Sequence, residues 1–286
     1  MHRTLLITTC ENEALMAKQR ESHADVVFLE LEDGVSLPGK DVARQRAVTA
    51  LKEWDYGTKE RWVRINSVLT LDGMKDVLAL AEGRPDALIP AKVRSADELI
   101  ATDYLLTRRE EELGLPIGGI KLCPMIESAP ALFNLRELIQ SSPRVKGLLL
   151  GAADLSVDMG LVRTEEEHEL DYVRGHLVLT AHAMGVECFD VTSTLINEPE
   201  TVYREAKRAC EHGFDGKACI SPSQVEAVHR GFAPDALEVE WAARILEGER
   251  EADARGVAVY AVDGHMVDMP IILAARRIME RSLVNS

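Results

Sequence analysis

The sequence predicts an α/β protein, a (β/α)8 TIM barrel with a C-terminal helical extension, and three observations lead to this fold class. Short apolar runs rich in β-branched residues recur along the chain. Stretches with helical spacing of apolar residues lie between them, and a charged, helix-like tail follows the eighth run. Strands that alternate with helices are typical of a parallel sheet. Eight such units fit one closed barrel in a chain of 286 residues, although an open doubly wound sheet would show the same alternation.

Each predicted strand is a short apolar run bounded by turn-forming or charged residues. The runs occupy residues 3–9, 26–32, 61–66, 87–93, 120–127, 145–155, 186–191 and 216–221. The stretches between them, such as 72–83 and 199–213, repeat apolar residues at helical spacing. The second of these stretches ends at Gly213, a residue suited to a helix C-cap.

The tail after the eighth run predicts a helix over 236–256, a short extended piece over 257–269 and a second helix from Pro270. We therefore expect a barrel over residues 1–232 and an extension over 233–286. A barrel does not need this extension in order to close, and an apolar helix stripe left in water favours association. The extension is thus predicted to pack on a neighbouring subunit, the alternative being that it folds back on its own barrel.

Composition excludes some classes of partner. The chain has 33 basic and 48 acidic residues, a net charge of −15 and a sequence pI near 5.0, which argues against nucleic acid and against an anionic membrane surface as partners. No apolar stretch reaches the roughly 20 residues of a membrane span. Five cysteines without a CxxC pair fit a reduced, cytoplasmic protein. A small anionic substrate remains compatible with this composition, because it needs only a local cluster of basic residues.

Charged residues follow several of the predicted strands, and in a barrel all carboxyl ends of the strands open onto one face. The run "VVFLELEDGV" is the clearest case, because three carboxylates lie within four positions and something electropositive should lie opposite them. The charged and polar residues at the strand ends are Glu32, Asp33, Arg64, Asn66, Lys92, Glu127 and Asp154.

Glu127 and Asp154 follow the fifth and sixth predicted strands, and neighbouring strands lie about 4.8 Å apart. Two carboxylates at that spacing, with room for water and substrate, suit Mg²⁺. Glu32 and Asp33 would then help to hold the water molecules of the metal, and the cation would be the missing positive charge. The alternative for each carboxylate taken alone is a solvated residue or a helix N-cap.

Two of the predicted strand-end residues are basic. Arg64 lies within an otherwise apolar strand, which indicates a carboxylate partner. Lys92 could form a salt bridge or a Schiff base with a ketone. The chain has no GxGxxG after a strand, no GxxxxGK[ST] and no HExxH motif.

The segments "LELEDGV", "VRIN", "PMIES", "GAADLSVDMG", "GFDGKACISPSQ" and "VDGHMVDMP" resemble, in order and spacing, those of the citrate lyase β-subunit and malyl-CoA lyase family. These proteins are TIM-barrel aldolases of the HpcH/HpaI aldolase superfamily. The resemblance implies an Mg²⁺-dependent carbon–carbon lyase that acts on a 3-hydroxyacyl-CoA such as malyl-, citramalyl- or citryl-CoA. It also implies a homo-oligomer, a trimer or a hexamer.

The resemblance also implies roles for individual residues. Glu127 and Asp154 resemble the Mg²⁺ ligands, and Glu32 and Asp33 resemble the acidic pair behind the metal's water molecules. Arg64 resembles the arginine that holds the oxygen of the oxo-acid.

Further residues follow from the same resemblance. Asp268 resembles the aspartate that a neighbouring subunit contributes as acid or base. Lys40 and Arg44, in "PGKDVAR", resemble a substrate-binding or cofactor-binding segment, and Asn66 joins them.

The chain departs from the family pattern in two places. Glu11 and Glu13 stand in the loop after the first strand, where basic residues associated with CoA are expected. Residues 220–222 read Ile-Ser-Pro instead of Ile-His-Pro. Three alternatives therefore stay open, namely an aldolase that acts on a free hydroxy-oxoacid, a Schiff-base aldolase through Lys92, and a non-catalytic barrel that serves as a subunit or ligand sensor.

Overall fold

The computed structural model describes residues 2–164 and 166–283 of the chain. The chain forms two compact units, residues 1–228 and residues 229–286, and each is described by itself. No helix in the described part of the chain is long and apolar enough to cross a membrane.

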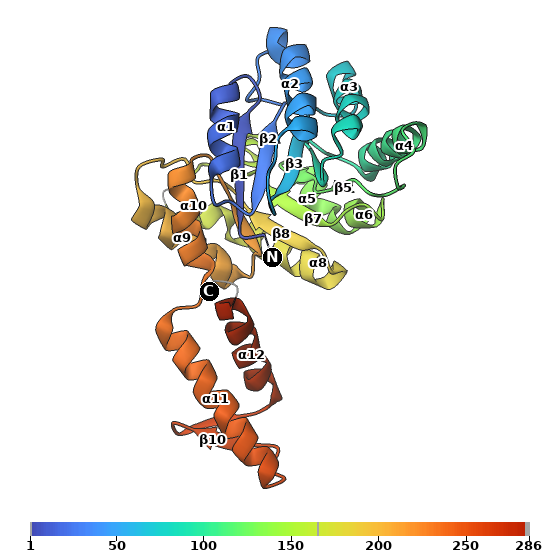
Figure 1. Ribbon diagram of the computed structural model, residues 1–286. Coiled ribbons are helices and arrows are strands. Elements are labelled where there is room, and N and C mark those ends of the chain that lie inside the picture. The colour runs from blue at the N-terminus through green and yellow to red at the C-terminus, as the bar shows by residue number, and fades with distance from the viewer. Residues whose placement is uncertain (1, 165, 284–286) are drawn as a thin grey trace. The chain divides into compact units, whose positions relative to one another are not determined.

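The first unit is a ring of parallel strands with helices around it (Figure 1). Its strands are β1 (Thr4–Thr9), β2 (Val26–Glu30), β3 (Glu60–Ile65), β4 (Ala87–Pro90), β5 (Lys121–Leu122), β6 (Met125–Ile126), β7 (Gly147–Leu150), β8 (Glu187–Asp190) and β9 (Gly216–Cys219). Their order in the sheet is β5-β4-β3-β2-β1-β9-β8-β7-β6, and β1 pairs with β9. All eight predicted runs contain strand, most of them over fewer residues than predicted.

The fifth predicted run is interrupted, which explains why the sheet has nine strand segments. β5 pairs with β4 and β6 pairs with β7, while Cys123 and Pro124 lie between the two short segments. Proline has no N–H to donate to a strand ladder. A parallel bridge between Leu122 and Val145 closes the ring at this point. The predicted (β/α)8 TIM-barrel fold is therefore confirmed, with one broken strand.

The helices of this unit follow the strands in alternation. They are α1 (Glu13–Glu21), α2 (Lys40–Glu53), α3 (Leu71–Leu80), α4 (Ala96–Glu112), α5 (Ala129–Phe133), α6 (Leu135–Gln140), α7 (Ala152–Met159), α8 (Asp171–Met184), α9 (Pro199–His212) and α10 (Pro222–Phe232). Short 3-10 turns lie at η1 (Leu37–Gly39), η2 (Ala81–Gly83) and η3 (His168–Leu170). Polar side chains cap the N-termini of several helices. The side chain of Asn12 accepts a hydrogen bond from the N–H of Leu15 at the start of α1, and α4 begins with a capping box of Ser95 and Glu98.

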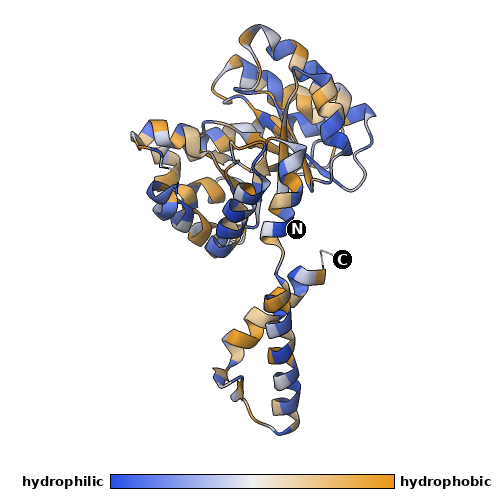
Figure 2. Cartoon of the chain, turned by 90° about the vertical axis from the view of Figure 1, so that its left-hand side faces the viewer, coloured by the Kyte–Doolittle hydropathy of each residue, from blue (hydrophilic) through white to orange (hydrophobic). Residues whose placement is uncertain are grey.

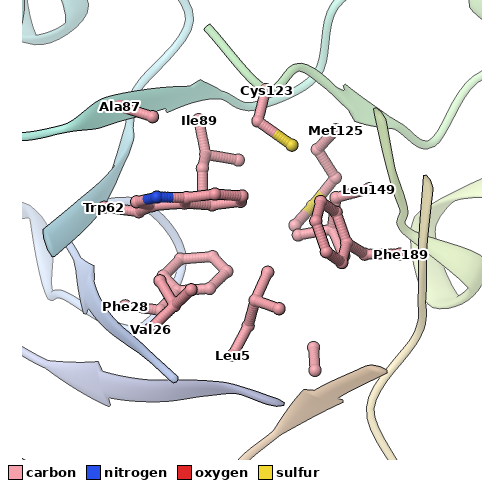
Figure 3. Close-up of a cluster of buried hydrophobic side chains, with 11 residues drawn as sticks. Leu5, Val26, Phe28, Trp62, Ala87, Ile89, Cys123, Met125, Leu149 and Phe189 are labelled. Atoms are coloured by element: carbon pink, nitrogen blue, oxygen red, sulfur yellow. The ribbon is translucent and has the colours of Figure 1, made fainter. Parts of the chain in front are cut away.

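Side chains fill the interior of the barrel (Figure 3). Trp62 and Phe189 meet edge to face, with ring centroids 5.4 Å apart. The remaining members of this core are Leu5, Val26, Phe28, Ala87, Ile89, Cys123, Met125, Leu149 and Ala218. Because the core occupies the middle of the barrel, any cavity for a ligand has to lie toward one end of the strands.

The second unit is a helix, a hairpin and a second helix. The sequence predicts both helices and a short extended piece between them, but not that this piece forms a hairpin. The unit comprises α11 (Ala236–Ala254), the antiparallel strands β10 (Tyr260–Val262) and β11 (His265–Val267), and α12 (Met269–Leu283). The hairpin turn has positive φ at Asp263 and Gly264, the geometry that favours Asp-Gly. The unit has its own apolar cluster around Ile245, Val267 and Ile272, and Figure 2 shows hydrophobic and hydrophilic residues alternating along its helices.

Candidate active site

A cavity of about 110 Å³ lies above the core, at the carboxyl ends of the strands. Three of the predicted site residues line it: Arg64 from β3, Glu127 after β6 and Asp154 near the start of α7. Met125, Leu149 and Ala218 belong both to the barrel core and to the cavity lining, so they form an apolar floor beneath the charged groups. Residues 151–153 and Thr192 complete much of the wall.

Glu127 is the most deeply buried carboxylate that lines this cavity, with 4% of the residue exposed. Burial raises the pKa of the Glu127 carboxyl to about 7. The Lys92 peptide N–H, which donates to Glu127 Oε1, and the charge of Arg64 oppose this rise in pKa. The nearby carboxylates of Asp154 and Glu32 add to it. Glu127 is therefore a carboxylate that a further positive charge would stabilise.

The turn between β7 and α7 leaves room for Glu127. A Cβ on Gly151 would lie 2.6 Å from the Cβ of Glu127 and 2.7 Å from its Oε2. Contacts that short do not occur without movement of one partner, so the glycine is needed for the carboxylate to lie where it does.

Asp154 lies in the first turn of α7 and not at a strand end as predicted. β7 already ends at Leu150, and Gly151 is the N-cap residue of the helix. The apolar run over 147–150 and the following Ala-Ala-Asp sequence form a strand, a glycine turn and a helix within eight residues. A carboxylate in the first turn of a helix is favourable next to the helix dipole.

Glu127 and Asp154 could hold a hard cation between them. Within residues 2–164 and 166–283, no group of three or more histidine, cysteine or acidic side chains is placed to hold a metal ion. A cation bound by these two carboxylates would therefore complete its oxygen shell with water or substrate, which is how Mg²⁺ is commonly bound.

The acidic segment after β2 has its counter-charges within the chain. Glu30 lies directly across from Arg64 in the β2–β3 register, and Arg64 Nε donates to Glu30 Oε2. Lys92 Nζ lies 2.6 Å from Glu32 Oε1 and 2.8 Å from Asp33 Oδ2. The sequence predicts a metal as this missing positive charge. In the structure Arg64 and Lys92 provide it, and Glu32 and Asp33 do not line the cavity.

Arg64 is a fixed positive charge at the edge of the cavity. Burial would lower the pKa of its guanidinium, but Glu30 and Glu32 outweigh burial and raise the pKa above its ordinary value. Its Nη1 lies 3.5 Å from Met125 Sδ, next to the cavity floor. The predicted carboxylate partner of Arg64 is therefore present, and it is Glu30, a residue absent from the predicted site. The register of β2 against β3 is the signal that could have identified it.

Lys40 does not reach the cavity. Its Nζ donates to Leu31 O, Glu32 O and Asn66 Oδ1 at 2.7–2.8 Å, which uses all three ammonium protons. Asn66 in turn donates to Leu31 O and to Asp76. Both predicted substrate contacts instead lie behind the acidic segment and hold its backbone.

Arg44 does not line the cavity either. Its guanidinium pairs with Asp76 at 2.6 Å, with Asp72 at 3.1 Å and with Asp41, and only 6% of the residue is exposed. The donors of Arg44 are thus turned toward carboxylates of α2 and α3. The structure gives it a role in joining two helices rather than in contacting a substrate.

Asp268 lies in the second unit, between β11 and α12, and is half-buried. Its carbonyl accepts hydrogen bonds from the N–H groups of Ile271 and Ile272, so it is at the start of α12. Its contribution to a neighbouring chain's site stays a prediction.

A barrel that gathers carboxylates and an arginine around a small cavity at the carboxyl ends of its strands has the layout of a barrel enzyme for a small anionic substrate. Comparison with known proteins identifies the family within this class. Residues 3–222 match the model of the HpcH/HpaI aldolase/citrate lyase family. The chain therefore belongs to the HpcH/HpaI aldolase/citrate lyase family, and it is an enzyme of the lyase class.

Individual relatives cover nearly the whole chain. The citrate lyase subunit beta of Leuconostoc mesenteroides subsp. cremoris is 34% identical over 285 residues, covering 100% of this chain and 94% of the relative. A (3S)-malyl-CoA thioesterase of Cereibacter sphaeroides is 30% identical, with 98% and 94% covered. Among solved structures, CitE from Mycobacterium tuberculosis in complex with magnesium, acetoacetate and coenzyme A superposes with a TM-score of 0.81 at 27% identity, and 98% of each chain is covered.

Proposed function

We propose that the chain catalyses the Mg²⁺-dependent cleavage or formation of a carbon–carbon bond in a 3-hydroxyacyl-CoA such as malyl-, citramalyl- or citryl-CoA. The observation that carries this proposal is the convergence of Arg64, Glu127 and Asp154 on one cavity. The names of the relatives and the magnesium and coenzyme A in a similar structure support the substrate class and the metal.

The donor set fits Mg²⁺. Glu127 and Asp154 would hold it, because burial raises the pKa of the Glu127 carboxyl and the charge of Arg64 does not offset this rise, so that a further cation would stabilise the carboxylate. Bound there, Mg²⁺ supplies Lewis-acid stabilisation of the negative charge that develops on oxo-acid oxygens. The cavity of about 110 Å³ suits the oxo-acid part of a substrate, so the rest of a thioester would extend toward solvent.

Residues of the chain itself would bind the substrate and transfer the proton. Arg64, a guanidinium under all ordinary conditions, orients the oxo-acid and stabilises charge on its oxygen. In cleavage, the hydroxyl proton passes to water, the oxygen forms the carbonyl of the oxo-acid, and the electrons of the broken carbon–carbon bond pass to the departing fragment as an enolate. That enolate carbon then takes up a proton. Asp268 of a neighbouring subunit is our proposed group for transferring the proton to or from that carbon.

A closed oligomer, a trimer or hexamer of this chain, is part of the proposal, because a site completed by Asp268 requires a second chain. Apolar residues around Asp268 support association. Met266 is 64% exposed, Met269 56% and Leu273 46%, so the second unit has an apolar surface beyond its own cluster.

A Schiff base on Lys92 has less support. Burial would lower the pKa of Lys92, but its hydrogen bonds to Asp33 and Glu32 outweigh burial and raise the pKa well above its ordinary value. A Schiff-base lysine needs a lowered pKa, so that the neutral amine is available.

One observation favours a second candidate, an aldolase that acts on a free hydroxy-oxoacid. Glu11, in the loop after β1, accepts hydrogen bonds from the N–H and hydroxyl of Ser36 and thereby joins the loops after β1 and β2. A carboxylate fixed at this position is unfavourable for the phosphates of CoA.

The decisive experiment measures release of glyoxylate, pyruvate and oxaloacetate from malyl-, citramalyl- and citryl-CoA and from the free acids, with Mg²⁺ and with chelator. We expect Mg²⁺-dependent release from a thioester. Release from free acids alone would favour the second candidate. Chelator-resistant activity together with borohydride trapping would favour the Schiff base, and a protein inactive with every substrate would leave the non-catalytic barrel.

The metal assignment is tested separately with Glu127→Gln. This change keeps the side-chain shape and removes the charge, so we expect Mg²⁺ affinity in calorimetry and turnover to fall by about 100-fold or more. The matched control is Glu137→Gln on the surface of α6, which should match the parent. Parental Mg²⁺ affinity in the Glu127→Gln protein would contradict the assignment.

A further inference from the structure

Lys92 has a left-handed backbone conformation, with φ +56°, two residues after the end of β4. Among the described residues only Arg84, Glu167 and Asp263 share a positive φ without being glycine. A lysine in this conformation is strained, and it persists only where its surroundings hold it.

The surroundings of Lys92 do hold it. Ala91 and Val93 on either side are buried. The N–H of Ala91 donates to Ile65 O at 3.2 Å, and the hydroxyl of Ser128 donates to Val93 O at 3.0 Å. The turn is thus fixed to β3 on one side and to the residue after Glu127 on the other.

The conformation lets one residue contact three carboxylates through two different groups. The peptide N–H of Lys92 donates to Glu127 Oε1. Its Nζ, at the other end of the residue, contacts Glu32 at 2.6 Å and Asp33 at 2.8 Å. Lys92 is therefore a link between the segment after β2 and the carboxylate after β6.

We propose that Lys92 is a positioning residue of the lyase site, one that fixes Glu127 through its peptide N–H and the Glu32–Asp33 segment through its ammonium. This inference rests on the proposed function. Without the ammonium, Glu32 and Asp33 would repel each other and Glu127, and the segment would shift away. Without the left-handed backbone, the N–H would no longer meet Glu127.

An ordinary surface ion pair does not account for these contacts. The Lys92 side chain is 44% exposed, but that of Glu32 is only 7% exposed, and a surface pair would not require a strained backbone. Lys52 provides the comparison, because its side chain is 45% exposed and its Nζ lies 2.8 Å from Glu82 on the outside of the barrel.

The experiment separates the effect of the Lys92 ammonium from the effect of its peptide N–H. Lys92→Gly removes the ammonium, keeps the N–H and relieves the strain of positive φ, whereas Lys92→Ala removes the ammonium and keeps the strain without the contacts that help to hold it. Lys92→Arg keeps the charge, and Lys52→Ala is the matched control. Each protein is tested for Mg²⁺ affinity by calorimetry, for kcat and KM with the best thioester, and for thermal unfolding without metal.

We expect Lys92→Gly to lose about 10-fold in Mg²⁺ affinity and Lys92→Ala to lose about 100-fold, the range found when groups behind metal ligands are removed. The loss of activity should fall on kcat rather than on KM. Added methylammonium should restore part of the activity of Lys92→Gly, Lys92→Arg should keep more activity than either, and Lys52→Ala should match the parent.

Parental Mg²⁺ affinity and kcat in both Lys92→Gly and Lys92→Ala would overturn the proposal while leaving the proposed function standing. Borohydride trapping of the substrate on Lys92 would overturn both, because Lys92 would then be the nucleophile of a Schiff-base aldolase. A parent that neither binds Mg²⁺ nor cleaves any substrate would also refute the proposed function, and the role of Lys92 with it.

Discussion

Arg64 and Glu30 form a cross-strand ion pair that positions a positive charge at this site. A partly buried guanidinium opposite a buried carboxylate keeps both charged groups in place, and Arg64 also lines the cavity. A pair of this kind is costly to break, because either partner alone would be an uncompensated buried charge. The same pair that stabilises the strand end therefore fixes the direction of the positive charge.

The first prediction is that Arg64→Lys lowers kcat by about 100-fold or more with little change in the melting temperature. Lysine keeps the charge opposite Glu30 but loses the planar fork that can contact Glu30 and a substrate together. Steady-state kinetics and thermal unfolding test this. The control is Arg61→Lys at the other end of β3, where Arg61 pairs with Asp86 at 3.0 Å, and it should keep parental kcat. Unchanged kcat in Arg64→Lys would remove Arg64 from the proposed mechanism.

The second prediction concerns His2, at the amino ends of the strands. Its ring contacts Glu187 at 2.9 Å and Glu60 at 3.2 Å, and these hydrogen bonds raise the pKa of His2 from 6.5 to about 9. A raised histidine pKa adds stability that is fully present below pH 6.5 and is lost as pH rises through about 9. After screening by solvent we expect the contribution to be about 1 to 2 kcal/mol.

Denaturant unfolding at pH 6 and at pH 9.5 measures this contribution. The parent should lose stability between these two pH values by more than the His2→Gln protein does. The control is His23→Gln, because His23 and His2 line one pocket, and this variant should behave like the parent. An identical pH dependence in the parent and in His2→Gln would contradict the assigned pKa.

At the scale of elements, the turn from β7 to α7 brings Asp154 to the cavity and makes room for Glu127. The third prediction is that Gly151→Ala lowers Mg²⁺ affinity and kcat, because its Cβ would lie 2.6 Å from the Cβ of Glu127. We expect a loss of about 10-fold or more, since small displacements of reacting groups are costly. Calorimetry and kinetics provide the measurement.

Gly175→Ala is the matched control for that glycine. Gly175 lies within α8, and a Cβ there would have no neighbour within 4 Å. The alanine should therefore leave kcat unchanged and stabilise the protein by up to about 1 kcal/mol. If Gly151→Ala behaved in the same way, the turn would have no special relation to Glu127.

The elements also show what the sequence could predict. The eight strand runs and the two helices of the tail follow from the spacing of apolar residues, because both kinds of element bury one face. The hairpin between the two helices was predicted only as a short extended piece. The break at Pro124 and the early end of β7 depend on where single residues leave the ladder, which periodicity does not resolve. Asp154 was therefore assigned to a strand although it lies in a helix.

The candidate site was predictable to a similar degree. Arg64, Glu127 and Asp154 come from different strand ends and line one cavity, since a barrel brings the strand ends together. The pairings among them depend on register and side-chain reach, which explains why Glu30 was missed and why Lys40 and Arg44 were placed at the substrate. The positive φ of Lys92 has no signal in the sequence, because the neighbouring turn and Ser128 impose it.

At the scale of the whole molecule, the second unit has a complete small core of its own together with exposed apolar residues near Asp268. A unit with a complete core of its own and no partner would have no need for further apolar residues exposed to solvent. These residues support the proposal that the unit packs on a neighbouring chain, with Asp268 completing that chain's site.

The fourth prediction tests this proposal with two inactive variants, Glu127→Gln and Asp268→Asn, that are dissociated, mixed in equal amounts and reassembled. In a cyclic oligomer with composite sites, about a quarter of the sites should combine an intact Glu127 with an intact Asp268 from the adjacent chain. Activity should therefore rise from near zero to about a quarter of the parental value. Each variant dissociated and reassembled alone is the control and should stay inactive. Mass spectrometry of the intact assemblies has to establish that mixed oligomers form. If mixed oligomers form and activity does not return, Asp268 acts within its own chain or has no catalytic part, and the exposed apolar surface of the second unit has another purpose.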